Sequence, residues 1–221
     1  AGRHGVKPLI GMEAYLTPRT SRFDKTRVRW GNGDEDDVSG GGAYAHLTLL
    51  AENTGGMHNL FRLSSLASLE GFYFKPRMDR ELLQTYSGGL IGTTGCPGGE
   101  VSTLLRLGRY DGALAAAAEF RDILGADNYF VELMEHGLPV ERRVREDLLR
   151  LARDLRLRGD GQDDCGREPH RPGRTQYKLP LLEHEPFVLE QRAEHRFEHG
   201  KVRFYSIGPY DSGGNALACS Q

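Results

Sequence analysis

The sequence lacks a long apolar run, an excess of one charge and a cysteine framework. It has no stretch of eighteen or more apolar residues and no charged-then-apolar leader, so nothing in it predicts a transmembrane segment. A formal net charge of −2 argues against a chain-wide electrostatic nucleic-acid binder and leaves only local contacts. The three cysteines are widely spaced without a CxxC pair, which favours a reducing, cytoplasmic location.

The length bounds the architecture. A chain of 221 residues can hold one large domain, or one domain with an appendage. It opens directly in Ala-Gly-Arg-His-Gly-Val, without a methionine, which is typical of the interior of a domain. We therefore expect a piece of a larger protein.

Apolar runs and helical periods alternate along the first part of the chain. Helical periods are expected at residues 56–69, 113–124 and 140–157, between shorter runs rich in strand formers. This alternation predicts an α/β fold, either a barrel or an open sheet, with its strands mutually parallel. The expected strands are Lys7–Tyr15, His46–Ala51, Leu90–Thr94 and Tyr129–Leu133.

A glycine-rich turn around Cys96 is the centre of this pattern. The apolar run from Leu90 breaks into Gly95-Cys96-Pro97-Gly98-Gly99 and then opens a helix. A strand, turn and helix in this order commonly present a reactive or metal-binding side chain at the edge of a sheet. The backbone N–H groups near Gly98 and Gly99 could also meet an anion there. The alternative is an ordinary tight loop with a small buried thiol.

Two connections carry charge or aromatic rings. Residues 17–42 form a long polar connection, first basic and then acidic, which is typical of a solvated excursion. Residues 72–77 combine three aromatic residues with Lys75 and Arg77. Such a segment can stack on a nucleotide, or it can simply pack a loop against a helix.

Four side chains in or just after expected strands can bind metal. Glu13, His46, Cys96 and His136 supply a carboxylate, two imidazoles and a thiol, a plausible mixed ligand set for zinc or manganese. Each alone has a commoner structural role, and the spacing is too wide to form a diagnostic motif.

Several long runs of the sequence are similar to one known protein family. The runs GVKPLIGMEAYLTP, HLTLLAENTGGMHNLF, LIGTTGCPGGEVSTLLRLGRYDGALAAAAEF and ERRVREDLLRLARDL closely resemble the PHP domain at the start of the bacterial DNA polymerase III alpha subunit. The resemblance covers residues 1–157. It implies a partial, distorted (β/α)₇ barrel holding a metal cluster that can support 3′–5′ exonuclease proofreading. By the same resemblance Glu13, His46 and Cys96 are metal ligands, whereas the role of His136 stays open.

The resemblance also has gaps. The family's opening H-x-H motif and its T-D-H-G motif would lie before Ala1, and its late N-D-x-H-Y motif is absent after Leu157. We therefore expect a fragment of a DNA-directed DNA polymerase, inactive alone, whose full-length parent binds DNA and other replicase subunits. The alternatives are a free-standing PHP-type phosphoesterase and a non-catalytic interaction module.

The segment after Leu157 has a different composition. Residues 158–174 are rich in arginine, glycine, proline and aspartate and have no hydrophobic period. We expect residues 158–221 to be an irregular tail that does not continue the domain at residues 1–157, with Cys165 and Cys219 unpaired. An out-of-frame reading of a GC-rich gene would produce such a composition, and a lineage-specific insertion or polar linker is the alternative.

Overall fold

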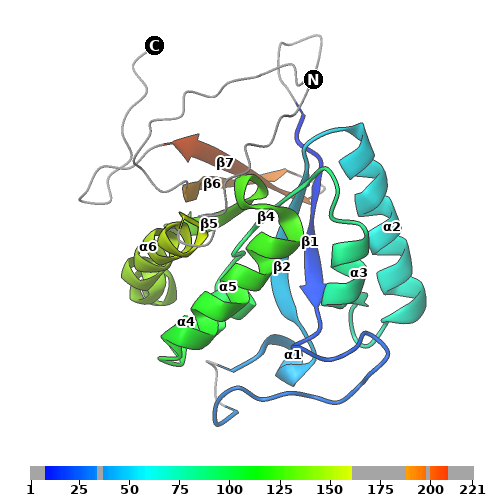
Figure 1. The fold of residues 1–221 in the computed structure, drawn as a ribbon, viewed down its shortest axis with the longest axis horizontal. Helices are drawn as coiled ribbons and strands as arrows, with labels where there is room; N and C mark the ends of the chain where they lie inside the picture. Colours follow the sequence, from blue (N-terminus) through cyan, green and yellow to red (C-terminus); the bar gives the residue numbers. More distant parts are fainter. Residues whose placement is uncertain (1–7, 34–36, 161–187, 198–199, 209–221) are drawn as a thin grey trace.

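A computed structural model of the chain describes residues 8–33, 37–160, 188–197 and 200–208 (Figure 1). These residues form a mixed α/β structure around one sheet with the strand order β3-β1-β2-β4-β5-β6-β7. The strands are β1 (Gly11–Leu16), β2 (Ala45–Ala51), β3 (Arg77–Met78), β4 (Leu90–Thr93), β5 (Tyr129–Met134), β6 (Val188–Phe197) and β7 (Gly200–Gly208). The α-helices are α1 (Ser39–Gly42), α2 (Thr54–Glu70), α3 (Arg80–Thr85), α4 (Glu100–Arg106), α5 (Tyr110–Leu124) and α6 (Pro139–Asp160), and a 3₁₀ turn covers Ala126–Asn128.

All four expected strands and three expected helices are present, but the strands are not all parallel. Strand β2 runs antiparallel to both β1 and β4, whereas β4 and β5 are parallel. The expectation of mutually parallel strands was therefore wrong. The described residues of the connection from Leu16 to Ala45 contain the short helix α1 and no crossover helix, and the chain returns at the same end of the sheet, where Leu16 and Ala45 are paired.

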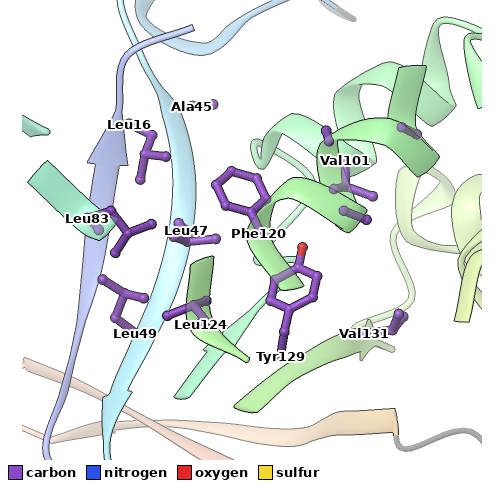
Figure 2. Packing of buried hydrophobic residues seen from close by; sticks show 14 of the residues in the cluster. Leu16, Ala45, Leu47, Leu49, Leu83, Val101, Phe120, Leu124, Tyr129 and Val131 are labelled. Carbon is purple, nitrogen blue, oxygen red and sulfur yellow. The ribbon is translucent and has the colours of Figure 1, made fainter. Parts of the chain in front are cut away.

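The two faces of the central sheet differ in polarity. Leu47 and Leu49 of β2 point toward the side on which Phe120 and Leu124 of α5 pack (Figure 2). His46 and Thr48, at alternate positions of β2, place polar side chains on the opposite face, because successive residues of a strand point to opposite sides. The register places Glu13 opposite Thr48, Tyr15 opposite His46 and Thr48 opposite Thr93, and these residues make up the polar face of the sheet.

The expected helices begin and end where local chemistry predicts. The side chain of Asn53 accepts a hydrogen bond from the Gly56 N–H at the start of α2, which satisfies one of the unpaired donors of the first turn. Gly125 follows α5 with φ 96°, a backbone conformation that favours glycine. Leu148, Leu151 and Leu155 of α6 recur at helical spacing and are buried.

A short strand and a short helix, β3 and α3, were not expected from the sequence. Asp79 caps α3 by accepting from the Leu82 N–H at 3.0 Å. The neighbouring Arg77 is fully buried and donates to four backbone carbonyls, those of Gly71 at 3.0 Å, Ala43 at 3.3 Å, Arg22 at 3.2 Å and Asp24 at 2.9 Å. Arg77 thereby fixes the long connection at residues 17–42 against the sheet.

Within residues 158–221 the structure describes two strands, and the expectation that this segment does not continue the domain stays a prediction. Strand β6 pairs parallel with β5, and β7 pairs antiparallel with β6. Most of residues 158–174, the stretch without a hydrophobic period, lies outside the described residues. Cys165 and Cys219 lie outside the described residues.

Among the described residues, none of the helices combines the length and the apolar character needed to cross a bilayer.

Candidate metal centre

Glu13, His46 and Cys96 converge on one point although they are far apart in the sequence. His46 Nδ1 lies 2.7 Å from Glu13 Oε1 and 3.5 Å from Cys96 Sγ, and Cys96 Sγ lies 4.0 Å from the same Glu13 oxygen. One ligand atom from each residue falls within 4.8 Å of the other two. The side chains of Glu13 and His46 are 35% and 23% exposed, so a cation can reach them from solvent.

The register of β1 and β2 brings the first two together. Glu13 is paired with Thr48 and Tyr15 with His46, so Glu13 and His46 are diagonal neighbours on the polar face. Diagonal positions on adjacent strands are within reach of long side chains. The rings of Tyr15 and Tyr44 lie 5.4 and 5.7 Å from the His46 ring and restrict its orientation.

The glycine turn brings Cys96 against β2. The His46 N–H donates to the Gly98 carbonyl at 3.0 Å, and His46 forms a parallel bridge with Gly99. A Cβ on Gly99 would lie 2.4 Å from the Thr94 carbonyl oxygen and 3.2 Å from that of His46, so this close approach requires glycine. The Gly99 N–H donates to the Cys96 carbonyl at 2.8 Å. The turn itself therefore uses the Gly99 N–H, one of the two groups that could have met an anion.

A buried ion network holds the other end of the turn. Glu100, the first residue of α4, has a side chain only 2% exposed. Its carboxylate lies 2.9 Å from Arg19 Nε and 2.6 Å from Arg80 Nη2. Arg80 Nε also lies 2.6 Å from Glu119 Oε2, and its guanidinium stacks on Phe120 at 4.9 Å. The position of Cys96 thus depends on residues from α3, α4 and α5.

The electrostatics of the group favour a positive charge at its centre. Burial lowers the pKa of His46, but hydrogen bonds and charge attraction from Cys96 and Glu13 outweigh this effect and raise the pKa to about 9 from the ordinary 6.5. Carboxylate, imidazole and thiol are all ligand types of zinc, and a divalent cation would supply the positive charge that this arrangement favours.

Glu132 is a further acidic residue of the polar face that sequence analysis did not single out. It is buried, and its Oε2 accepts from Thr93 at 2.5 Å and from Thr48 at 3.3 Å, while its N–H donates to Thr94 Oγ1 at 2.9 Å. The available signal was a glutamate flanked by Val131 and Leu133 within a buried strand. Through these hydrogen bonds Glu132 holds Thr48 and Thr93 on the polar face, and Thr48 is the strand partner of Glu13.

His136 does not join the group. Among the described residues, the cluster of possible ligands contains only Glu13, His46 and Cys96. The His136 Nδ1 lies 2.7 Å from Glu141 Oε1, and the backbone N–H groups of His136 and Leu138 both donate to Glu141 Oε2, at 2.7 and 3.4 Å. These contacts give His136 and Glu141 a structural role at the start of α6.

Comparisons with known proteins find relatives that share one name. The chain is 54% identical over 173 residues to the DNA polymerase III subunit alpha of Saccharopolyspora erythraea, which covers 74% of this chain. It is 56% identical over 209 residues to the protein of the same name from Mycobacterium leprae, which covers 93% of this chain, and 46% identical over 153 residues to that of Thermus aquaticus, which covers 69%. Because 93% of the chain is more than residues 1–157, the Mycobacterium leprae alignment extends beyond Leu157.

These relatives are much longer than the chain. The chain spans 14% of the Saccharopolyspora protein, 17% of the Mycobacterium leprae protein and 12% of the Thermus protein. The family profile described as the PHP domain matches residues 1–136, which is more than half of the sequence and includes Glu13, His46 and Cys96. The chain belongs to the PHP domain family.

Proposed function

We propose that this chain is a segment of a bacterial DNA polymerase III alpha subunit that carries most of the PHP domain. The observation that carries this proposal is identity above one half to relatives of that name over most of the chain. The full-length protein would be a cytoplasmic DNA-directed DNA polymerase that acts on DNA together with other replicase subunits. The segment itself would be inactive as a polymerase, because in the family the polymerase aspartates lie far beyond this length.

Within this segment, Glu13, His46 and Cys96 would serve as ligands of a divalent cation, zinc or manganese. Their donor atoms already lie within 4.8 Å of one another, and their chemistry fits these metals. The bound metal would supply an activated water for phosphodiester hydrolysis in 3′–5′ proofreading. Parts of the parent outside this chain would complete both the ligand set and the distorted (β/α)₇ barrel, to which the described strands contribute one continuous sheet.

The ligand roles predict a specific loss of metal binding. The chain should bind zinc or manganese weakly, because it has only part of the family's ligand set, and it should show no measurable exonuclease activity. Cys96→Ser and His46→Ala should each weaken zinc binding by about tenfold or more, since loss of one donor leaves only two. Isothermal titration of the chelator-treated chain with zinc measures this.

The matched control is His58→Ala, which removes an exposed imidazole on α2, away from the cluster. Its zinc affinity should equal that of the unaltered chain. Equal zinc affinity in all variants would contradict the ligand roles. If one metal ion per chain remained bound after dialysis against a chelator, the prediction of weak binding by an incomplete ligand set would be wrong.

The same preparation separates the alternative functions. A free-standing phosphoesterase would hydrolyse a small phosphate monoester in the presence of manganese, and Glu13→Gln would abolish that activity. A non-catalytic interaction module would hydrolyse neither a monoester nor DNA, and the small set of three candidate ligands in the described part of the chain favours this candidate for the segment alone.

The boundary at Leu157 also stays a proposal, with residues 1–157 as the partial PHP domain. Translation of the coding DNA past Leu157 in the other two frames tests the origin of residues 158–221. An N-D-x-H-Y stretch in one of them would support an out-of-frame tail, and its absence from both would contradict it. Because the Mycobacterium leprae alignment extends beyond Leu157, it favours the absence of such a stretch from both frames.

A further inference from the structure

The turn between α2 and β3 displays aromatic rings to solvent. Phe72 and Phe74 are 60% and 59% exposed, while Tyr73 is half-buried between them. The Tyr73 N–H donates to the Lys75 carbonyl at 3.0 Å, which closes the turn, and the rings of Tyr73 and Phe74 lie 4.5 Å apart. We call residues 72–75 the aromatic turn. Its exposed rings bury little area, so they add little to the core.

Phe74 adopts a costly backbone conformation. Its φ is 61°, in the left-handed region that large side chains rarely occupy. Strained conformations of this kind persist where surrounding structure enforces them, and they gather at binding sites. Glycine at this position would relieve the strain, so packing and backbone preference do not explain the phenylalanine.

Two cations flank the aromatic turn. The guanidinium of Arg27 lies 5.1 Å from the Phe74 ring, and its Nε lies 3.4 Å from the Tyr73 hydroxyl. Lys75 Nζ lies 5.4 Å from the ring of Tyr15. Both cationic side chains belong to exposed residues. Rings that accept bases, beside cations that accept phosphates, are the usual combination of a single-strand nucleic-acid surface.

The aromatic turn is continuous with the candidate metal centre. Tyr15 contacts Lys75 on one side and the His46 ring on the other, at 5.4 Å in each case. Tyr15 is also paired with His46 in β2 and with Arg77 in β3, so the sheet itself joins the two places. A strand lying along the aromatic turn would therefore have one end near Glu13, His46 and Cys96.

We propose that the aromatic turn and Arg27 bind single-stranded DNA, with a base stacked on Phe74 and phosphates paired with Arg27 and Lys75, and guide the strand toward the metal centre. The direction of the strand, with its 3′ end at the metal, rests on the proposed proofreading function. The surface itself rests on the rings, the cations and the strained backbone. Binding of a protein partner by the exposed phenylalanines is the competing outcome.

The test measures binding without hydrolysis. A fluorescein-labelled oligothymidylate of about 12 nucleotides is titrated with the chain in excess chelator, and fluorescence anisotropy reports the dissociation constant. Phe74→Gly should weaken binding about tenfold, because stacking of one base is lost. The same substitution should raise the melting temperature, because the left-handed strain is relieved. A loss of affinity in a more stable protein cannot result from misfolding.

Two controls separate stacking from charge and from a general surface effect. Phe61→Ala removes a ring that is 57% exposed on α2 and should leave affinity unchanged. An abasic oligonucleotide of equal length keeps the phosphates but not the bases, and should bind the unaltered chain about tenfold more weakly than oligothymidylate. Arg27→Gln and Lys75→Gln should each reduce the salt dependence of binding, since each removes a phosphate contact.

Several results would overturn the proposal. These are no binding of oligothymidylate by the unaltered chain, equal binding of the abasic strand, or equal effects of Phe74→Gly and Phe61→Ala. Replicase proteins captured through Phe74 without any DNA binding would assign the surface to a protein partner instead. Failure of the zinc titration alone would contradict the metal centre but leave DNA binding in chelator intact, so the two proposals fail separately.

Discussion

Replacement of Arg77 by leucine is expected to lower the free energy of unfolding by about 3–5 kcal/mol. The arginine is fully buried, and its guanidinium donates to four backbone carbonyls on three separate stretches of the chain. Leucine would leave these carbonyls without their donor in a region that excludes water. Urea unfolding followed by circular dichroism measures the change.

The matched control for this prediction is Arg62→Leu. Arg62 is an exposed residue of α2 whose guanidinium contacts Asn59 and the ring of Tyr86. Its loss should change the free energy of unfolding by about 0.5 kcal/mol or less. The loss of unfolding free energy for Arg77→Lys should lie between those of the two leucine substitutions. An ammonium group has three donors on one nitrogen, whereas the guanidinium has five donors on three nitrogens. Equal destabilisation by the two leucine substitutions would show that Arg77 does not fix the connection at residues 17–42.

The second large effect is expected from Glu100→Met, which should destabilise the protein by about 3–5 kcal/mol. This substitution removes the buried carboxylate that pairs with Arg19 and Arg80, and it leaves the more exposed Glu119 as the remaining ion-pair partner of Arg80 among the described residues. Glu100 also begins the helix that follows the Cys96 turn, so zinc affinity should fall together with stability. Chemical unfolding and zinc titration of the same sample measure both.

A double-mutant cycle separates the ion pair from loss of packing. Combining Glu100→Met with Arg80→Met removes both charges, and the double variant should be more stable than the sum of the single effects predicts, by about 1–3 kcal/mol. Glu119→Gln, at a more exposed partner of Arg80, should cost far less. Strict additivity of the two methionine substitutions would contradict the role of the buried pair.

The fold was predictable where the pattern is local. The period of α6 and the glycine after α5 identified helices, because amphipathic spacing and helix ends are properties of neighbouring residues. Strand direction was not predictable, because the apolar run at residues 46–51 could pair with β1 equally well in a parallel or an antiparallel orientation. Strand β3 has only two residues and carries no period, although Asp79 was an available signal for the start of α3.

The candidate site was predictable only through family resemblance. Glu13, His46 and Cys96 are separated by 33 and 50 positions, and no spacing rule connects them. Their convergence depends on strand register and on the glycine turn, which the sequence alone does not determine. Glu132 was missed because one carboxylate within an apolar strand does not indicate which hydroxyl groups will surround it.

The placement of the metal-type residues has a consequence for the effect of substitutions. Glu13 and His46 lie on the polar face and remain partly exposed, whereas Arg77 and Glu100, which hold the surrounding chain, point elsewhere and touch no ligand atom through the contacts described above. The three candidate ligands are therefore separate from the buried contacts that hold the surrounding chain. Single substitutions at these positions can therefore abolish metal binding and leave the fold of the domain in place.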